Sequence, residues 1–439
     1  MYKADLIKTD GNGVAHNREE QPILSHFSKL LFLIFVTYLV LPIFDIPLLG
    51  LSISAPILFL VFLNIVSTHS QKTTKLHLRW VIIGYILWLG LLSSLVGNNI
   101  FRNIDVSTSD IVTLIRFAYW IIAFLTTSIV ISTISDIDNL YILLGFSILL
   151  LGGYRLYEAI FFGRWGAWTN TELMSQNSYG FQFSSYFPFA LILPLTLKGY
   201  KRAISSMALI LLILAIAING SRSSWITTII SSTLLVIIYL YTNRKLKKLI
   251  VSRTIIILLG FVLLFTNLPT NFLSPVVARF ETFNTLDSDR SFIIRELMIQ
   301  KGLRLFEDNP IFGAGIGRFT VSSVPLDIPT LLRYADQSHF DVKSSHNSYI
   351  AFLGETGLVG TIPFLFLHLS LILGGLSASI RLAKHGHVWP IAVFCSYIGM
   401  SIHLWSLSGL TSTSPWFIYG MVAGIIVRAT IYQDKEVHS

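Results

Sequence analysis

Hydrophobic runs of about twenty residues dominate the chain and alternate with short polar connections. A run of that length crosses the hydrocarbon core of a bilayer as a helix, which satisfies its own backbone hydrogen bonds. The pattern predicts twelve spans, at 29–46, 50–67, 79–97, 110–133, 139–162, 181–197, 203–219, 223–241, 251–269, 347–376, 387–408 and 413–432. We therefore predict an all-α polytopic membrane protein.

The longest polar segment, residues 270–346, separates the ninth and tenth predicted spans. Its stretch SFIIRELMIQKGLRLFEDNP has the spacing of an amphipathic helix, with Asp287 or Ser288 as the predicted cap. The predicted apolar face consists of Phe292, Ile293, Leu297, Leu303 and Leu305. The predicted organisation is a tail at 1–28, spans one to nine at 29–269, the long loop at 270–346, spans ten to twelve at 347–432 and a tail at 433–439.

Composition agrees with a membrane protein, because 53% of the residues are hydrophobic and only 13% are charged, against about 25% charged in soluble proteins. A net charge of +9 is compatible with nucleic-acid binding, but in a membrane protein the basic residues collect in cytoplasmic loops. We therefore predict no nucleic-acid partner. The single cysteine, Cys395, lies in an apolar run and excludes a disulfide within the chain and a cysteine-based metal site.

Basic residues crowd alternate connections between the predicted spans. They are Lys72, Lys75, Arg79, Lys198, Lys201, Arg202, Arg244, Lys245, Lys247, Lys248, Arg253, Arg381 and Lys384. Lysine and arginine in short loops stay on the cytoplasmic side. Both termini are thus predicted to be cytoplasmic, and the loop at 270–346 to face the opposite side. One predicted inner connection departs from this pattern, since it carries Asp136 and Asp138 and no basic residue.

Several arginines gather on the predicted outer side. Arg222 follows a tight turn between two apolar runs, Arg116 lies within the outer part of the fourth span, and Arg290 and Arg295 open the amphipathic helix. An arginine at a helix end commonly snorkels to the interface, but basic residues are disfavoured on this side. The guanidinium fork matches phosphate. We therefore predict anion binding by these arginines, with Arg290 favoured over Arg295 because helix N-termini attract anions.

A histidine marks the point where the long loop re-enters the membrane. His346 and Asn347 lie in the stretch Ser-Ser-His-Asn-Ser, at the start of the tenth span. A neutral imidazole there is able to accept a proton from a hydroxyl group. The alternative is a structural histidine that caps the helix, and His339 and His403 are rival candidates. Glu355, nine residues further on, is expected to orient the backbone or to pair with an arginine such as Arg116.

Two further patterns limit the chemistry. No Asp-x-Asp or Glu-x-x-His pair lies on the predicted outer side, so we predict a site without a metal ion or other cofactor. Gly313-Ala314-Gly315-Ile316-Gly317 is similar to a phosphate-binding loop, but no Lys-Ser/Thr follows and no strand is predicted before it. We interpret this segment as a turn after the amphipathic helix.

These motifs together resemble the O-antigen ligase and polysaccharide polymerase superfamily. The resemblance is strongest over residues 175–370. It rests on Asn177-x-Tyr179-Gly180, Ser221-Arg222-Ser223-Ser224-Trp225, Glu307-Asp308-Asn309-Pro310 before Phe312-Gly313-Ala314-Gly315, and His346-Asn347 before Gly357-Leu358-Val359-Gly360. The twelve-span layout with one long outer loop agrees with it as well.

The resemblance implies a metal-independent, inverting glycosyltransferase at the periplasmic face of the bacterial inner membrane. Its donor is a glycan on undecaprenyl pyrophosphate, and its acceptor is lipid A-core in a ligase or a carrier-linked repeat unit in a polymerase. Arg222 and Arg290 match residues implicated in pyrophosphate binding, and His346 matches the acceptor-activating histidine. Asn177, Asn347 and Glu355 are further candidate substrate-binding residues. Trp165, Trp168, Tyr179 and Tyr334 are candidates to stack on sugars. We favour the ligase; a transporter or flippase would need broken helices at the midplane, which the pattern lacks.

Overall fold

The computed structural model describes residues 26–40, 57–58, 60–63, 71–134, 137–163, 174–242, 270–281, 284, 289–329, 332 and 337–437. Every regular element in these ranges is a helix, and seven of the helices are long and apolar enough to cross a membrane. The predicted all-α polytopic class is therefore confirmed. The predicted span at 251–269 and most of the one at 50–67 lie outside the described residues, so the count of twelve stays a prediction.

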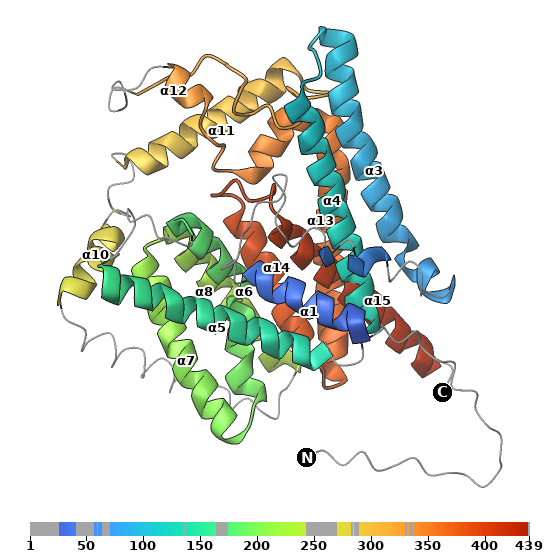
Figure 1. Cartoon of the computed structure of the whole chain (residues 1–439), viewed down its shortest axis with the longest axis vertical. Helices are drawn as coiled ribbons and strands as arrows, with labels where there is room; N and C mark the ends of the chain where they lie inside the picture. The colour runs from blue at the N-terminus through green and yellow to red at the C-terminus, as the bar shows by residue number, and fades with distance from the viewer. Residues whose placement is uncertain are drawn as a thin grey trace.

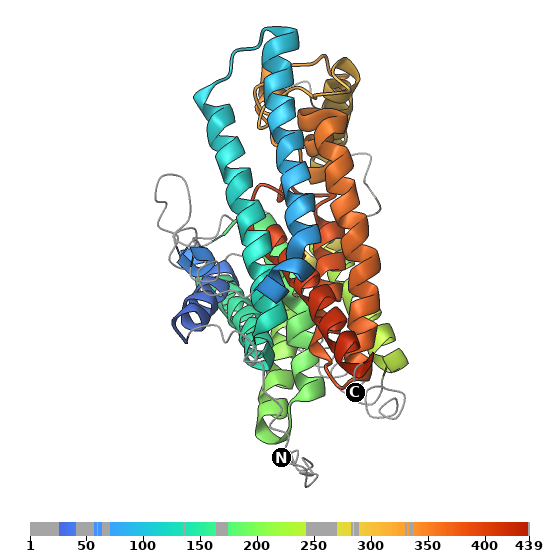
Figure 2. The same ribbon diagram turned by 90° about the vertical axis from the view of Figure 1, so that its right-hand side faces the viewer.

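Four helices form one half of the bundle: α3 (Gln71–Arg102), α4 (Thr108–Thr133), α13 (Ser348–Lys384) and α15 (Thr413–Val437). The long helices α3, α4 and α13 run roughly parallel to one another in two views (Figures 1 and 2). Small residues let the backbones approach closely. A Cβ at Gly420 of α15 would lie 2.5 Å from the Phe124 carbonyl oxygen of α4, and one at Gly90 of α3 would lie 2.2 Å from the Val359 carbonyl oxygen of α13.

The other half contains α5 (Ile137–Phe162), α6 (Gln176–Thr196), α7 (Gly199–Asn219), α8 (Arg222–Thr242) and α14 (Trp389–His403), with α1 (His26–Val40) beside α5. The predicted tight turn at 219–222 is confirmed: α7 ends at Asn219, α8 begins at Arg222, and Gly220 between them has a φ of +69°. Glycine adopts this left-handed conformation without a steric cost.

A cap covers one end of the bundle. It consists of α10 (Thr270–Glu281), α11 (Arg290–Asp308), α12 (Gln337–Asp341) and the described residues 309–329 and 332 between α11 and α12. Figure 1 shows α11 beside the upper end of α4, and α11 also packs against α13. The predicted amphipathic helix is confirmed as α11. Its N-cap is Asp289, so the predicted caps Asp287 and Ser288 are wrong. Ile293, Leu297 and Leu305 are buried in a core of their own, together with residues of the following segment. Phe292 and Leu303 are each 39% exposed and are not part of the buried face.

A break divides α13. Gly357 has φ +56° and ψ −155°, which ends one helical stretch and starts another. The segment after α11 satisfies the freed backbone groups on both sides of the break. The carbonyls of Gly354 and Glu355 accept hydrogen bonds from the N–H groups of residues 314 and 315, at 2.8 and 2.9 Å. The N–H groups of residues 358 and 359 donate to the carbonyls of residues 310 and 311, at 2.9 and 3.1 Å. The cap is thereby tied to the bundle by main-chain hydrogen bonds.

Candidate active site at the capped end

Three arginines from three helices surround one aspartate beneath the cap. Arg222 is the first residue of α8 and is only 7% exposed, and its Nη2 lies 2.6 Å from Asp289 Oδ2. Arg279, near the end of α10, has its Nη1 3.9 Å from the same oxygen, while its Nε donates to the Gly220 carbonyl oxygen at 3.1 Å. Arg295, on the second turn of α11, interacts electrostatically with both arginines and with Asp289. We call Arg222, Arg279 and Arg295 the arginine cluster.

The electrostatics of this cluster favour a bound anion. Burial lowers the pKa of Arg279 and Arg295, and the neighbouring guanidinium groups lower each further, against the opposing effect of Asp289. Guanidinium groups nevertheless remain charged in proteins. Burial raises the pKa of Asp289, but the charge of Arg222 and the N–H groups of Ser291 and Phe292 bring it below the ordinary value. Among the described residues, three cations thus surround the carboxylate of Asp289, and this concentration of positive charge favours an anionic ligand.

His346 occupies a constrained position at the start of α13. Its φ is +51°, which is rare for a residue other than glycine. Its backbone N–H donates to Ser408 Oγ at 2.9 Å, and that oxygen also lies 2.8 Å from Ser345 Oγ. Next to it, Ser348 Oγ donates to the Leu407 carbonyl oxygen at 2.5 Å and accepts from the Gly409 N–H at 2.9 Å. The loop after α14 therefore fixes the backbone that presents the imidazole. Such strain, where the surroundings hold it, is typical of functional positions.

The His346 imidazole has the protonation state that a general base needs. Burial lowers its pKa, and the positive charges of Arg295 and Lys343 lower it further. Because the ordinary value is about 6.5, the side chain is neutral at neutral pH. The effect of Arg295 on this pKa also connects His346 to the arginine cluster.

His403, at the end of α14, is a second residue that links the arginine cluster to the surroundings of His346. It is 1% exposed, with Nδ1 2.9 Å from Ser184 Oγ and Nε2 3.5 Å from Ser223 Oγ. Ser223 directly follows Arg222, and the chain after His403 leads to Ser408 at His346. His403 is thus a packed residue between α6, α8 and α14. It is buried, whereas His346 is partly exposed, so His346 is the better candidate for a general base.

The other sequence-predicted residues have distinct surroundings. Arg290 is exposed at the first position of α11. Asn347 is buried and caps α13, since its Oδ1 accepts from the N–H groups of residues 349 and 350, each at 3.1 Å. Asn177 is half-buried in the first turn of α6, next to Gln176, whose Nε2 donates to the Asn219 carbonyl oxygen at 2.8 Å. Arg116 is half-buried on α4. Substrate binding by these residues stays a prediction.

Glu355 holds the glycine-rich segment. Its side chain is 9% exposed, and Oε1 accepts from the Phe319 N–H at 2.9 Å. This contact agrees with the expectation that it orients the backbone. The interpretation of residues 313–317 as a turn is also confirmed, because Gly313, Gly315 and Gly317 have φ angles of +70°, +110° and +76°.

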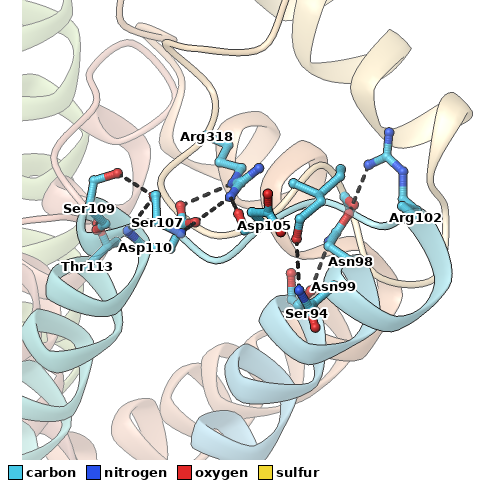
Figure 3. Close-up of polar contacts among 12 residues, drawn as sticks. Ser94, Asn98, Asn99, Arg102, Asp105, Ser107, Ser109, Asp110, Thr113 and Arg318 are labelled. Carbon is cyan, nitrogen blue, oxygen red and sulfur yellow. Dashed lines mark hydrogen bonds and ion pairs between the residues drawn. The ribbon is translucent and has the colours of Figure 1, made fainter.

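The same segment docks where α3 ends and α4 begins, as Figure 3 shows. Arg318 forms an ion pair with Asp110, to whose Oδ1 its Nε donates at 3.1 Å, and its Nη2 donates to the Asp105 carbonyl oxygen at 2.7 Å. On α3, Ser94 Oγ donates to the Phe312 carbonyl oxygen at 2.5 Å, and Asn98 Nδ2 donates to that of Gly313 at 3.1 Å. These contacts attach the cap to the end of α3 and the start of α4.

Sequence reasoning missed Arg279, Asp289 and the contacts of His403. Arg279 and Asp289 lie ten positions apart in the long polar loop, where charged residues of both signs are common. Their meeting at Arg222 depends on how α10 and α11 fold over the α7–α8 turn. Among the predicted aromatics, Tyr179 is fully buried and donates to Glu158 Oε2 at 2.9 Å, so sugar stacking by Tyr179 is wrong. Trp165, Trp168 and Tyr334 lie outside the described residues.

Comparison with known families places these features in context. Residues 207–365 match the family described as O-Antigen ligase. The matched stretch contains the arginine cluster and His346, and it ends within α13, eight residues after the break at Gly357. A comparison with curated proteins found no match. The resemblance to the O-antigen ligase superfamily is therefore confirmed for this segment, and the family implies a glycosyltransferase-like membrane enzyme of the ligase or polymerase kind.

Proposed function

We propose that this multi-pass membrane protein is an O-antigen ligase-type glycosyltransferase of the inner membrane. It transfers a glycan from undecaprenyl pyrophosphate to a hydroxyl of an acceptor sugar, lipid A-core in the ligase reading, at the periplasmic face. The observation that carries the proposal is the arginine cluster, with Arg222 buried and Arg279 and Arg295 partly buried, within electrostatic range of a neutral, partly exposed His346. A lipid-linked diphosphate leaving group and a hydroxyl nucleophile need those two features together.

The chemistry divides between the two features. His346 accepts the proton of the acceptor hydroxyl while the hydroxyl oxygen forms a bond to the anomeric carbon. The bond between that carbon and the phosphate oxygen breaks on the opposite side, so the configuration inverts. The electron pair of the broken bond stays on the diphosphate, where Arg222, Arg279 and Arg295 stabilise the added negative charge. Because the arginines supply this charge, the proposed reaction requires no metal ion. We expect Arg290, which is exposed at the start of α11, to bind the donor as it enters the site.

The test compares His346→Ala with His339→Ala, which alters a histidine of α12 outside the motif. His346→Ala should lower turnover roughly 10²–10⁴-fold, the usual scale of general base catalysis, and should leave donor binding nearly unchanged. His339→Ala should retain most of the activity. Donor affinity and turnover should be measured side by side with purified protein in lipid discs. Wild-type turnover in His346→Ala, or a loss confined to donor binding, would leave His346 as a structural residue.

The same assay distinguishes the two members of the family. With lipid A-core as acceptor, a ligase attaches one glycan per acceptor molecule. With only carrier-linked repeat units, a polymerase produces a ladder of longer glycans. Lipid A-core glycosylation without a ladder is the expected result, and a ladder formed without lipid A-core would favour the polymerase.

A further inference from the structure

The two carboxylate oxygens of Asp289 have different partners. Oδ1 caps α11, accepting from the N–H groups of Ser291 and Phe292 at 2.8 and 3.3 Å. Oδ2 faces the arginine cluster, 2.6 Å from Arg222 Nη2 and 3.9 Å from Arg279 Nη1. One oxygen is sufficient for the cap, and asparagine or serine caps a helix about as well as aspartate. The negative charge beside the arginines is therefore not explained by the fold of α11 alone.

That charge opposes the function proposed for the cluster. A phosphate oxygen that binds Arg222 has to share its guanidinium group with Asp289, and the carboxylate repels it. The side chain is only 10% exposed, so water screens the repulsion weakly. Its lowered pKa keeps the group ionised at neutral pH. Asp289 thus weakens the binding of every anion at the cluster.

The weakening is larger for the product than for the donor. In a glycan-linked lipid diphosphate, each phosphate group carries one negative charge. Breaking the bond to the glycan turns the outer phosphate into the terminal phosphate of a lipid diphosphate, which gains a second ionisable oxygen and, like a phosphate monoester, a further charge above a pKa of about 6. Because repulsion grows with the charge of the ligand, Asp289 disfavours the released lipid diphosphate more than the intact donor.

We propose that Asp289 is a specificity-determining residue that competes for Arg222 and so prevents tight retention of the diphosphate product. This inference rests on the proposed function and adds to it a role for a residue that contacts the phosphate-binding arginines. It predicts that removing the charge of residue 289 while keeping the N-terminal hydrogen bonds of α11 tightens diphosphate binding and slows product release.

The experiment uses Asp289→Asn in the full chain, with inorganic pyrophosphate and inorganic phosphate as probes. Pyrophosphate should inhibit glycan transfer about tenfold more strongly in Asp289→Asn than in the wild type, the scale of one partly screened charge interaction. Inhibition by phosphate should change less. Direct binding of pyrophosphate by calorimetry should show the same order. Asp289→Ser is a second variant that is able to accept the N-terminal hydrogen bonds of α11, in case the asparagine variant folds poorly.

Asp327→Asn is the matched control, because Asp327 pairs with Arg304 on the outer part of the cap and is 78% exposed. It should leave pyrophosphate inhibition unchanged. Weaker or unchanged pyrophosphate binding in both Asp289 variants, with Arg222→Lys still inactive, would overturn the inference and leave the proposed function intact. Near-normal transfer by Arg222→Lys would instead count against the proposed function itself.

Discussion

Gly357 is the position in α13 where the bundle leaves no room for a Cβ atom against the backbone of the cap. Its φ of +56° with ψ of −155° belongs to a region that is essentially restricted to glycine. A Cβ there would lie 2.4 Å from the Ile311 carbonyl oxygen and 2.5 Å from the Gly313 nitrogen. Both contacts are with backbone atoms, which cannot rotate away. We therefore predict that Gly357→Ala forces residues 310–315 out of the break in α13.

The size of the effect follows from what is lost. The strained conformation of an alanine costs about 1–3 kcal/mol. Displacement of residues 310–315 breaks the four backbone hydrogen bonds across the break, at about 0.5–1.5 kcal/mol each. The total is about 3–9 kcal/mol, comparable to the roughly 5–15 kcal/mol that stabilises a whole domain. The cap should undock while the helices remain inserted, because the helices keep their own packing.

Hydrogen exchange followed by mass spectrometry measures this undocking. Protection should fall at the N–H groups of residues 314, 315, 358 and 359 in Gly357→Ala. Glycan transfer should fall as well, because residues 310–315 directly follow α11, the helix that carries Arg295. Gly153→Ala is the control: its Cβ would have no heavy atom within 4 Å, on the exposed side of α5. Unchanged protection and transfer in Gly357→Ala would refute the interpretation of the break as the anchor of the cap.

Four other predictions address the site and its setting. Arg222→Lys should lose most of the transfer activity while the protein stays inserted, because lysine lacks the guanidinium fork; near-normal glycan transfer would reduce Arg222 to a packing role. Activity should decline as pH falls through the pKa of His346, and Arg295→Gln should shift that decline to higher pH, because a positive charge that lowers the pKa is removed; a pH–rate profile with no shift would contradict this. Transfer by purified protein should survive EDTA, and loss restored by magnesium or manganese would reveal a missed metal site. Reporter tags at Ser439 and within 244–248 should lie in the cytoplasm and a tag at Asp327 in the periplasm, and a cytoplasmic signal at Asp327 would reverse the orientation.

The local elements of this fold were predictable because short-range chemistry determines them. The hydrophobic periodicity identified α11, and the polar tight turn before Arg222 marked the junction of α7 and α8. The break in α13 was not predictable from hydropathy, because residues on both sides of Gly357 are apolar and continue the pattern of a single span. Its cause is a long-range exchange of backbone hydrogen bonds with residues 310–315, and no local signal in either segment specifies that partner.

The candidate site was predictable as a set of residue types and only partly as a set of contacts. Arg222 and His346 were identified because a charged or titratable group beside a membrane span is unusual. Arg279 and Asp289 gave no such signal, because charge is ordinary in a polar loop. The structure also shows that Asn347 accepts hydrogen bonds from the first turn of α13, a role that its sequence position alone leaves open.

Asp289 also explains how three guanidinium groups remain together beneath the cap. Their mutual repulsion and their burial disfavour the folded state, as the lowered pKa values of Arg279 and Arg295 indicate. The carboxylate offsets part of this cost, and its own pKa is lowered in return. Its contribution to stability is therefore present above the ordinary pKa of an aspartate and is lost as pH falls through the lowered value. The charge that keeps the cluster folded is the charge that competes with phosphate, so Asp289→Asn should reduce stability near neutral pH while it tightens pyrophosphate binding. A single substitution that shifts melting temperature and pyrophosphate affinity in opposite directions would be difficult to obtain from a residue that only capped α11.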